Sequence, residues 1–230
     1  MNFEQWLQSR LTAHGYPVGV IDGVIGDKTI AALKAFQAAR KLETTGTADS
    51  ATVTALRFSA SNPVGQQPRP IGAQPTSQWP RQNGVSAFYG KVGTSQGRLQ
   101  LPFPMKLAWD KSHVVTSITL HTKVLDSAGR AFAEIAETYN EKERADLGID
   151  LFGGSLNVRR MRGGTAYSMH SWGIAIDFDP ERNQLRWKAP KARLSHDDAV
   201  PFWRAWEKEG WVSLGRARNF DWMHCQAARL

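Results

Sequence analysis

The chain has 230 residues, of which 41% are apolar, and a formal net charge of +8 at pH 7. This length suits one or two domains with a substantial hydrophobic core, and the single cysteine, Cys225, excludes an internal disulfide. No apolar run approaches membrane-spanning length, so we do not expect an integral membrane protein.

Three short helices are expected at the N-terminus. Residues 2–14 repeat apolar side chains at helical spacing. A loop rich in turn residues follows over 19–26, Asp27 is placed to cap a second helix, and residues 50–56 favour a third. Helices of this size predict a compact three-helix module over residues 1–57.

The loop of this module carries a distinctive run of residues, Asp22-Gly23-Val24-Ile25-Gly26-Asp27-Lys28-Thr29, which is followed by Phe36-Gln37 and Thr45-Gly46. These segments resemble the peptidoglycan-binding domain 1 family of three-helix cell-wall modules. The resemblance implies bacterial peptidoglycan as a partner, with Asp22, Thr29 and Gln37 as candidate wall-binding residues. The alternative is that Asp22 and Thr29 only cap helices and form turns, which such residues often do.

The composition changes after the module. Residues 58–77 are rich in Pro, Gln and Gly and predict an interdomain linker. A second domain is expected over 78–230, with a strand at 114–124 and a helix from Asp126 to about Arg144. The order of its predicted elements favours an α+β domain with a mainly antiparallel sheet.

Two short motifs in the second domain carry the chemistry. His170 and Asp177 are seven positions apart, and Asp221 precedes His224 by three. A catalytic zinc ion takes three nitrogen or oxygen ligands from the protein and keeps a fourth position for water. His170, Asp177 and His224 supply that set for one Zn²⁺ per chain, and Asp221 is then the carboxylate that accepts and passes on a proton. The alternative is that each histidine is a packed or solvated residue without a metal.

Written out, the two motifs are Ser-x-His-x-x-Gly-x-Ala-x-Asp, over residues 168–177, and Asp-x-x-His, over residues 221–224. They resemble the M15 family of zinc peptidases, which includes D-Ala-D-Ala carboxypeptidases and L-alanyl-D-glutamate endopeptidases. The resemblance implies that His170, Asp177 and His224 are the zinc ligands and that Asp221 is the catalytic acid and base. The chain departs from the family pattern at 210–215 and at Cys225-Gln226, which leaves the scissile bond open.

An arginine-rich stretch precedes the first motif. A hydrolase that forms a tetrahedral oxyanion benefits from a fixed positive donor, and arginine suits that task and the binding of a substrate carboxylate. The M15 pattern has such an arginine upstream of the His motif, which fits Arg159 best and Arg162 second. Ser168 belongs to the motif and is a candidate for positioning substrate. The alternative for the arginines is a solvated loop.

The positive charge favours a polyanionic partner. Residues 182–230 contain ten Lys or Arg against five Asp or Glu, so much of the excess lies in the second domain. No nucleic-acid-binding motif accompanies the charge, so nucleic acid is the weaker interpretation and electrostatic contact with an anionic cell envelope is favoured.

These features predict a monomeric, modular peptidoglycan hydrolase that cuts a stem-peptide amide, with L-Ala–D-Glu as the favoured bond. The N-terminus has no basic region and no apolar region of a signal peptide, so we expect synthesis in the cytoplasm of a host bacterium and action on the wall after release, as in a phage endolysin. Two alternatives remain open: a D-Ala-D-Ala carboxypeptidase of the same family, and a wall-binding protein whose metal site is inert.

Overall fold

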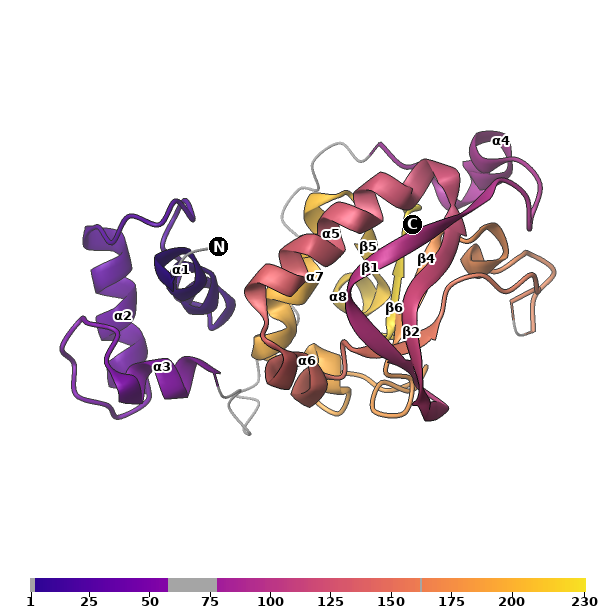
Figure 1. The fold of residues 1–230 in the computed structure, drawn as a ribbon. Helices are drawn as coiled ribbons and strands as arrows, with labels where there is room; N and C mark the ends of the chain where they lie inside the picture. The colour runs from indigo at the N-terminus through magenta and orange to yellow at the C-terminus, as the bar shows by residue number, and fades with distance from the viewer. Residues whose placement is uncertain (1–2, 58–77, 162) are drawn as a thin grey trace. The chain divides into compact units, whose positions relative to one another are not determined.

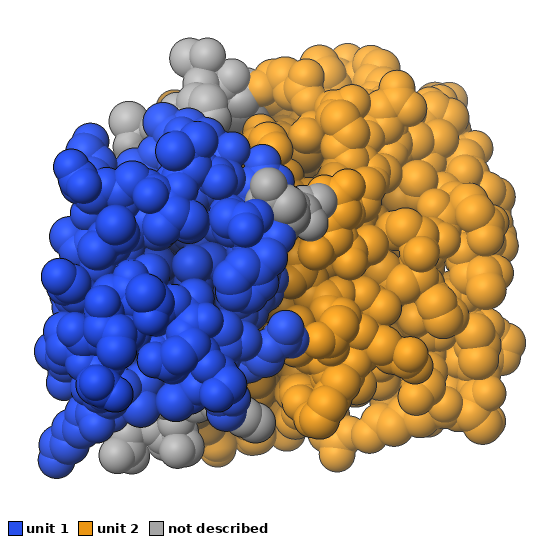
Figure 2. Space-filling model, turned by 60° about the vertical axis from the view of Figure 1, so that its left-hand side comes forward, with its two compact units in different colours: residues 1–65, 196–201 blue, residues 66–195, 202–230 orange. Residues whose placement is uncertain are grey.

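The structure, a computed structural model, describes residues 3–57, 78–161 and 163–230. The chain divides into two compact units (Figure 2), of which the first comprises residues 1–65 with 196–201 and the second residues 66–195 with 202–230. The predicted linker at 58–77 and the candidate residue Arg162 lie outside the described residues. No helix among the described residues is both long enough and apolar enough to cross a membrane.

The N-terminal module consists of the three expected helices, α1 (Phe3–Ala13), α2 (Asp27–Ala39) and α3 (Ser50–Arg57). Each helix turns an apolar stripe inward, and the buried side chains form one small core that includes Leu11, Phe36 and Leu56, none of which is exposed. The buried guanidinium of Arg10 donates from Nε to the carbonyl of Leu56, 3.0 Å away, so α1 satisfies a carbonyl at the end of α3 that the helix itself cannot.

The second unit alternates short helices with strands, in the α+β arrangement that was expected. The helices at 125–138 and 200–208 lie side by side against a six-stranded sheet, and the helix at 85–89 lies apart from them (Figure 1). In chain order the helices and strands are α4 (Val85–Tyr89), β1 (Gln96–Leu107), β2 (Asp110–His121), α5 (Leu125–Thr138), α6 (Glu141–Leu147), β3 (Leu151–Gly154), β4 (Ala175–Phe178), α7 (Val200–Lys208), β5 (Val212–Ser213), α8 (Leu214–Arg218) and β6 (His224–Gln226). Short 3-10 helices lie at η1 (Gln82–Gly84), η2 (Thr122–Val124), η3 (Met169–Trp172), η4 (Arg193–Ser195) and η5 (Asp197–Ala199).

The strands follow the order β2-β1-β3-β4-β6-β5 across the sheet. All neighbouring pairs are antiparallel except β1 and β3, which run parallel. The prediction of a mainly antiparallel sheet is therefore confirmed. The order also brings β4 and β6 together, although 45 residues of sequence separate the end of one from the start of the other.

Aromatic rings fill the space between the sheet and the helices. Phe178 of β4 lies 5.0 Å from Phe202 and 5.9 Å from Trp206, both of α7, and Trp206 lies 5.1 Å from Phe132 of α5, measured between ring centroids. None of these four side chains is exposed. A buried phenylalanine contributes about 1.5–3 kcal/mol through burial alone, so this cluster fixes the back of β4 firmly.

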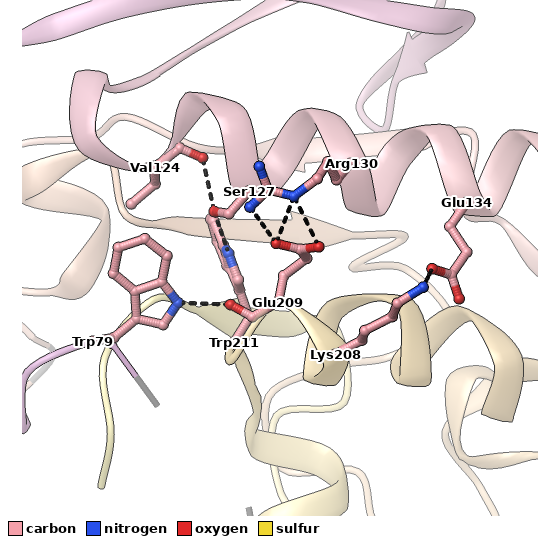
Figure 3. Close-up of polar contacts among 8 residues, drawn as sticks. All are labelled: Trp79, Val124, Ser127, Arg130, Glu134, Lys208, Glu209 and Trp211. Carbon is pink, nitrogen blue, oxygen red and sulfur yellow. Dashed lines mark hydrogen bonds and ion pairs between the residues drawn. The ribbon is translucent and has the colours of Figure 1, made fainter. Parts of the chain in front are cut away.

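Polar contacts tie α5 to the end of α7 (Figure 3). Arg130 makes a bidentate ion pair with Glu209, the closest approach being 2.6 Å, and Glu134 pairs with Lys208 at 2.7 Å. Below them the indole Nε1 of Trp211 donates to Ser127 Oγ at 3.1 Å. The exposed pairs contribute little individually, whereas the indole bond is buried and satisfies a group that would be costly to leave alone.

The predicted elements at 114–144 need two corrections. The strand expected at 114–124 runs from Asp110 to His121 and is followed by the 3-10 helix η2. The single helix expected from Asp126 to about Arg144 is two helices, because Asn140 begins a new one: its side chain accepts from the Glu143 backbone, and the Glu143 side chain accepts from the Asn140 backbone.

Candidate metal centre

Asp177 and His224 come from neighbouring strands and face each other. They are Cα partners in the antiparallel pairing of β4 with β6, and residues opposite each other in such a pair have side chains on the same face, with Cβ atoms about 5 Å apart. The sheet therefore delivers a carboxylate and an imidazole to one point, from elements that cannot shift without breaking the pairing.

His170 reaches the same point from the 3-10 helix η3, which is closed by Gly173 in the left-handed conformation with φ 68°. A side chain at Gly173 would be strained by that φ, and the end of the Gln96 side chain would have to move to make room for it. Glycine is therefore required where η3 turns into β4, and this turn sets the direction from which His170 approaches Asp177.

The three side chains place their ligand atoms in a compact triangle. His170 Nε2 lies 3.2 Å from His224 Nδ1 and 3.2 Å from Asp177 Oδ2, and His224 Nδ1 lies 2.9 Å from Asp177 Oδ1. Two ligands that share a zinc ion at about 2.05 Å in tetrahedral geometry would lie about 3.3 Å apart. The two Asp177 distances end on different carboxylate oxygens. With one ligand atom taken from each residue, the three atoms all lie within 4.8 Å of one another, which brings them close enough to share one metal ion.

The outer nitrogens of both histidines face acceptors, and this fixes which nitrogen carries the proton. His170 Nδ1 is 3.0 Å from the Ser155 carbonyl, which can only accept. His224 Nε2 is 3.1 Å from Gln226 Oε1, whose orientation follows because the Gln226 amide nitrogen donates to the Ala228 carbonyl. With protons on the outer nitrogens, neutral His170 and His224 turn their lone pairs inward. Two lone pairs and a carboxylate that face one another need a cation between them, so the donor set fits a divalent metal.

The electrostatics of the triangle agree with this. Burial raises the pKa of Asp177, but His170 and His224 outweigh that effect and hold the pKa well below its usual range. Burial lowers the pKa of His224, yet its bond to Asp177 and the charges of Asp177 and Asp221 raise it overall. The site therefore attracts positive charge, either as a proton or as the metal ion that replaces it.

Asp221 stands beside the triangle without joining it. It is not among the described residues that could hold a metal together, which are His170, Asp177 and His224. Its backbone is left-handed with φ 55°, its N–H donates to the Leu185 carbonyl at 3.1 Å, and its carbonyl accepts from His224 N–H at 3.1 Å. Such a φ is uncommon for a residue other than glycine and indicates that the surroundings hold it in place.

The carboxyl of Asp221 is buried and polar but has a free acceptor. Within the described part of the chain Oδ1 has no hydrogen-bond partner. Burial raises the pKa of Asp221 to about 6, the charge of Asp177 adds to the increase, and His224, His170 and Arg159 oppose it. A carboxyl with a pKa near neutrality can both accept and release a proton, which is what a general acid and base must do.

The arginine and serine candidates lie on the chain that enters η3. Arg159 is exposed, and its charge lowers the pKa of Asp221, so its guanidinium lies within electrostatic reach of the centre. The backbone of Arg159 is held by Ser171, whose Oγ accepts from Arg159 N–H at 3.0 Å and donates to its carbonyl at 2.7 Å. Ser168 is buried, its backbone N–H donates to the Arg159 carbonyl, and its hydroxyl forms no helix-capping bond.

Three groups that support the centre were missed in the sequence: Ser155, Ser171 and Gln226. Ser155 acts through its carbonyl, which every residue has, so no residue type could have indicated it. Ser171 and Gln226 lie one and two positions from a predicted ligand, and polar side chains so placed are natural candidates to orient it.

The wall-binding candidates of the N-terminal module separate into surface and interior. Asp22 is exposed, and its Oδ1 accepts from Val24 N–H at 2.8 Å and from Gln8 Nε2 at 3.1 Å, as in an Asx turn. Gln37 is fully buried and bonds to Gly46 N–H at 2.8 Å and to Thr52 Oγ1 at 2.9 Å. Thr29 is also buried. The side chains of Gln37 and Thr29 thus lie inside the module, where they hold its loops rather than face a ligand.

The centre is of the mononuclear metallohydrolase type: two imidazoles and a carboxylate with a second carboxylate beside them. Comparison with protein families identifies both parts of the chain. Residues 5–56 match the family described as putative peptidoglycan binding domain, and residues 162–227 match the M15 peptidase family described as D-alanyl-D-alanine carboxypeptidase.

The chain therefore joins a peptidoglycan-binding domain 1 at its N-terminus to an M15 peptidase domain at its C-terminus. The second match covers all four motif residues, from His170 to His224. Together the two domains support a peptidase that acts on peptidoglycan. Neither curated proteins nor solved structures gave a match to the chain.

Proposed function

We propose that the chain is a zinc-dependent endopeptidase that cuts the L-Ala–D-Glu amide of peptidoglycan stem peptides and so opens the wall, as a phage endolysin does. The observation that carries the proposal is the triangle of His170, Asp177 and His224, whose ligand atoms, one from each residue, all lie within 4.8 Å of one another. The peptidoglycan-binding domain supports the wall as substrate, and cleavage within the stem would break cross-linked strands.

The chemistry of each residue follows from its position. A zinc ion bound by the triangle would supply a Lewis acid and lower the pKa of a water molecule towards neutrality. Asp221 would accept the proton that the attacking water loses and then deliver it to the departing amine nitrogen. Arg159 would stabilise the negative charge that develops on the carbonyl oxygen of the scissile amide.

The N-terminal module would keep the enzyme on an insoluble substrate. Tethering raises the effective concentration of the peptidase at the wall even when the module itself binds weakly. The loop around Asp22 is the candidate contact, because it exposes Val20 and Val24 by 76% and 66% beside a fixed carboxylate. Thr29 and Gln37 then act indirectly by holding the loops of the module.

A second function, trimming of terminal D-Ala by a D-Ala-D-Ala carboxypeptidase, is favoured by the description of the family that residues 162–227 match. Mass spectrometry of digested muropeptides distinguishes the two activities. The proposal expects one product that ends in the free carboxyl of L-Ala and another that begins with the free amine of D-Glu. Release of single D-Ala residues with intact L-Ala–D-Glu bonds would replace the endopeptidase with the carboxypeptidase.

A third reading, a wall-binding protein with an inert site, is tested by metal analysis and two variants. We expect about one zinc ion per chain in the parent protein, loss of zinc and activity in His224→Ala, and retention of zinc with a loss of activity of roughly 10²–10⁴-fold in Asp221→Asn. Equal lysis of purified walls by Asp221→Asn and the parent would remove Asp221 from the mechanism.

A further inference from the structure

A cationic surface is connected by hydrogen bonds to the loop that holds Asp221. It is built from two segments of the second unit, residues 184–193 and 214–220, neither of which contains an acidic residue. Four of their basic side chains are exposed: Arg186, Lys188, Lys191 and Arg218. We call these four residues the cationic rim.

The rim is fixed to the loop that holds Asp221. The Leu185 carbonyl accepts from Asp221 N–H at 3.1 Å, and Ala189 N–H donates to Asn219 Oδ1 at 2.7 Å. Asn219 Oδ1 also accepts from Trp222 Nε1 at 3.0 Å. The segment of Arg186 and Lys188 is therefore attached at both ends to residues 219–222, within a few residues of the proposed proton-transfer group and the ligand His224.

The charges of the rim are not neutralised by neighbours. Other basic residues nearby are paired: Arg182 with Asp179 at 2.5 Å and Arg216 with Glu207 at 2.6 Å. Within the described residues, no ion pair involves a rim residue. Lys191 Nζ makes a cation–π contact with the Trp187 ring, 4.0 Å from its centroid. Like charges grouped on one surface create a positive potential that attracts anions.

Each of the two segments also exposes an apolar side chain. Leu185 is 36% exposed and Phe220 is 38% exposed, and the hydrogen bond between Leu185 and Asp221 brings the two segments together. A surface that combines guanidinium and ammonium groups with exposed apolar side chains suits a peptide that carries carboxylates and methyl groups.

We propose that the cationic rim binds carboxylates of the stem peptide on the segment that flanks the scissile amide. The inference rests on the proposed function and adds to it the chemical class of the flanking residues. A D-Glu residue that continues the peptide through one carboxyl keeps its other carboxyl free, so an acidic group lies next to the bond proposed to be cut. Attachment of the rim to Asp221 favours the substrate as the occupant over a wall polymer or a lipid surface.

The test compares two soluble stem peptides that differ only in charge, one with free carboxylates and one with carboxamides in their place. We expect the parent protein to cleave the acidic peptide with a roughly tenfold higher kcat/KM, the difference lying mainly in KM and shrinking at high salt. The variant Arg186→Gln, Lys188→Gln, Lys191→Gln, Arg218→Gln should cleave both peptides at nearly the same rate.

A matched control removes charge elsewhere in the same domain. Lys111 and Lys142 are exposed and pair with Glu181 and Asp146, so Lys111→Gln, Lys142→Gln should keep the parent preference. Equal cleavage of the two peptides by the parent would overturn the inference. The inference would also be overturned if the variant with all four rim residues changed to Gln kept the peptide preference but no longer adsorbed to purified walls. The rim would then bind a wall polymer.

Binding separates failure of the inference from failure of the proposed function. Calorimetry with the Asp221→Asn variant measures the affinity for both peptides without cleavage. A preference for the acidic peptide, with no cleavage by the zinc-loaded parent, would sink the peptidase proposal and keep the rim. Equal affinities for the two peptides, together with cleavage by the parent, would overturn the rim inference and keep the peptidase proposal.

Discussion

Gln226 favours the tautomer of His224 in which Nδ1 faces the candidate metal centre, because its Oε1 accepts from the outer nitrogen at 3.1 Å. Gln226→Leu removes that acceptor and leaves the ring free to take the other tautomer. We expect the affinity for zinc to fall about 10–100-fold, measured by competition with a chelator. Gln226→Glu, which keeps an acceptor, should retain most of the affinity. An unchanged affinity in Gln226→Leu would mean that strand pairing alone orients the ring.

Asn219 is expected to position Asp221. It is left-handed with φ 50°, and its Oδ1 accepts from both Ala189 N–H and Trp222 Nε1. Asn219→Ala loses both bonds and disfavours the backbone conformation, so kcat should fall about tenfold with little change in KM if the Asp221 carboxylate moves by about 1 Å.

Steady-state kinetics checks this, and Asn219→Asp should restore much of kcat because it keeps an acceptor and tolerates the left-handed region. Were KM to rise with kcat unaffected in Asn219→Ala, the residue would act on substrate binding instead.

At this scale the sequence indicated the proposed ligands but not their surroundings. His170, Asp177 and His224 were predicted as ligands mainly because their motifs resemble the M15 family, and the structure brings the three side chains together. The Ser155 carbonyl that orients His170 could not be predicted, since any residue offers the same group. Gln37 was a candidate wall-binding residue and is buried, because a polar residue that bonds loop backbones looks the same in sequence as one that binds a ligand.

Among the elements, the break between α5 and α6 is the clearest lesson. The apolar repeat continues through Tyr139 and indicated one long helix, whereas the capping box of Asn140 and Glu143 begins a second. Asn140→Ala should destabilise the protein by about 1 kcal/mol, measured by urea unfolding. Lys142→Ala, in the same exposed turn, is the comparison and should change the stability much less. Equal effects of the two substitutions would show that the cap contributes nothing special.

Strand β1 was absent from the sequence interpretation for a physical reason. It contains Pro102 and Pro104, which argue against a strand inside a sheet because proline cannot donate to a ladder. The structure places both prolines where the pairing with β2 shifts register, between Gln100 and Met105. An irregularity of this kind accommodates residues without a backbone donor, and nothing local in the sequence distinguishes it from a loop.

For the whole molecule, the division into a helical wall module and an α+β peptidase domain could be predicted because both have distinctive residue patterns. The order of the strands could not. The approach of β4 and β6 depends on packing across the sheet, which hydrophobic alternation within a single strand does not encode.

The stability of the molecule should depend on pH through His14. Its Nε2 lies 3.1 Å from the Leu56 carbonyl, and burial lowers its pKa to about 4. An unfolded histidine titrates near 6.5. Between these values the unfolded chain binds a proton that the folded chain does not, so the free energy of unfolding falls as the pH falls.

The loss should begin below about pH 6.5 and reach about 3 kcal/mol near pH 4, from a shift of about 2.5 pKa units at 1.36 kcal/mol each. Hydrogen exchange of amides in α1 and α2, compared near pH 7 and near pH 4, measures it. His14→Gln should lose less over the same interval. If the parent and His14→Gln lose equal stability, carboxylates rather than His14 set the acid sensitivity.

The triangle of His170, Asp177 and His224 has a mechanical consequence. His170 and His224 are 54 positions apart, and the chain has a single cysteine, so it cannot form an internal disulfide. A metal ion that binds both only in the folded chain would stabilise the fold by about 4 kcal/mol at a free metal concentration of about 1,000 times Kd. Removal of the metal by a chelator should therefore abolish hydrolysis. It should also release β6, which carries His224, from one of its attachments and lower the melting temperature. A bound metal ion would thus link two distant parts of the chain, as a disulfide does in proteins that have two cysteines.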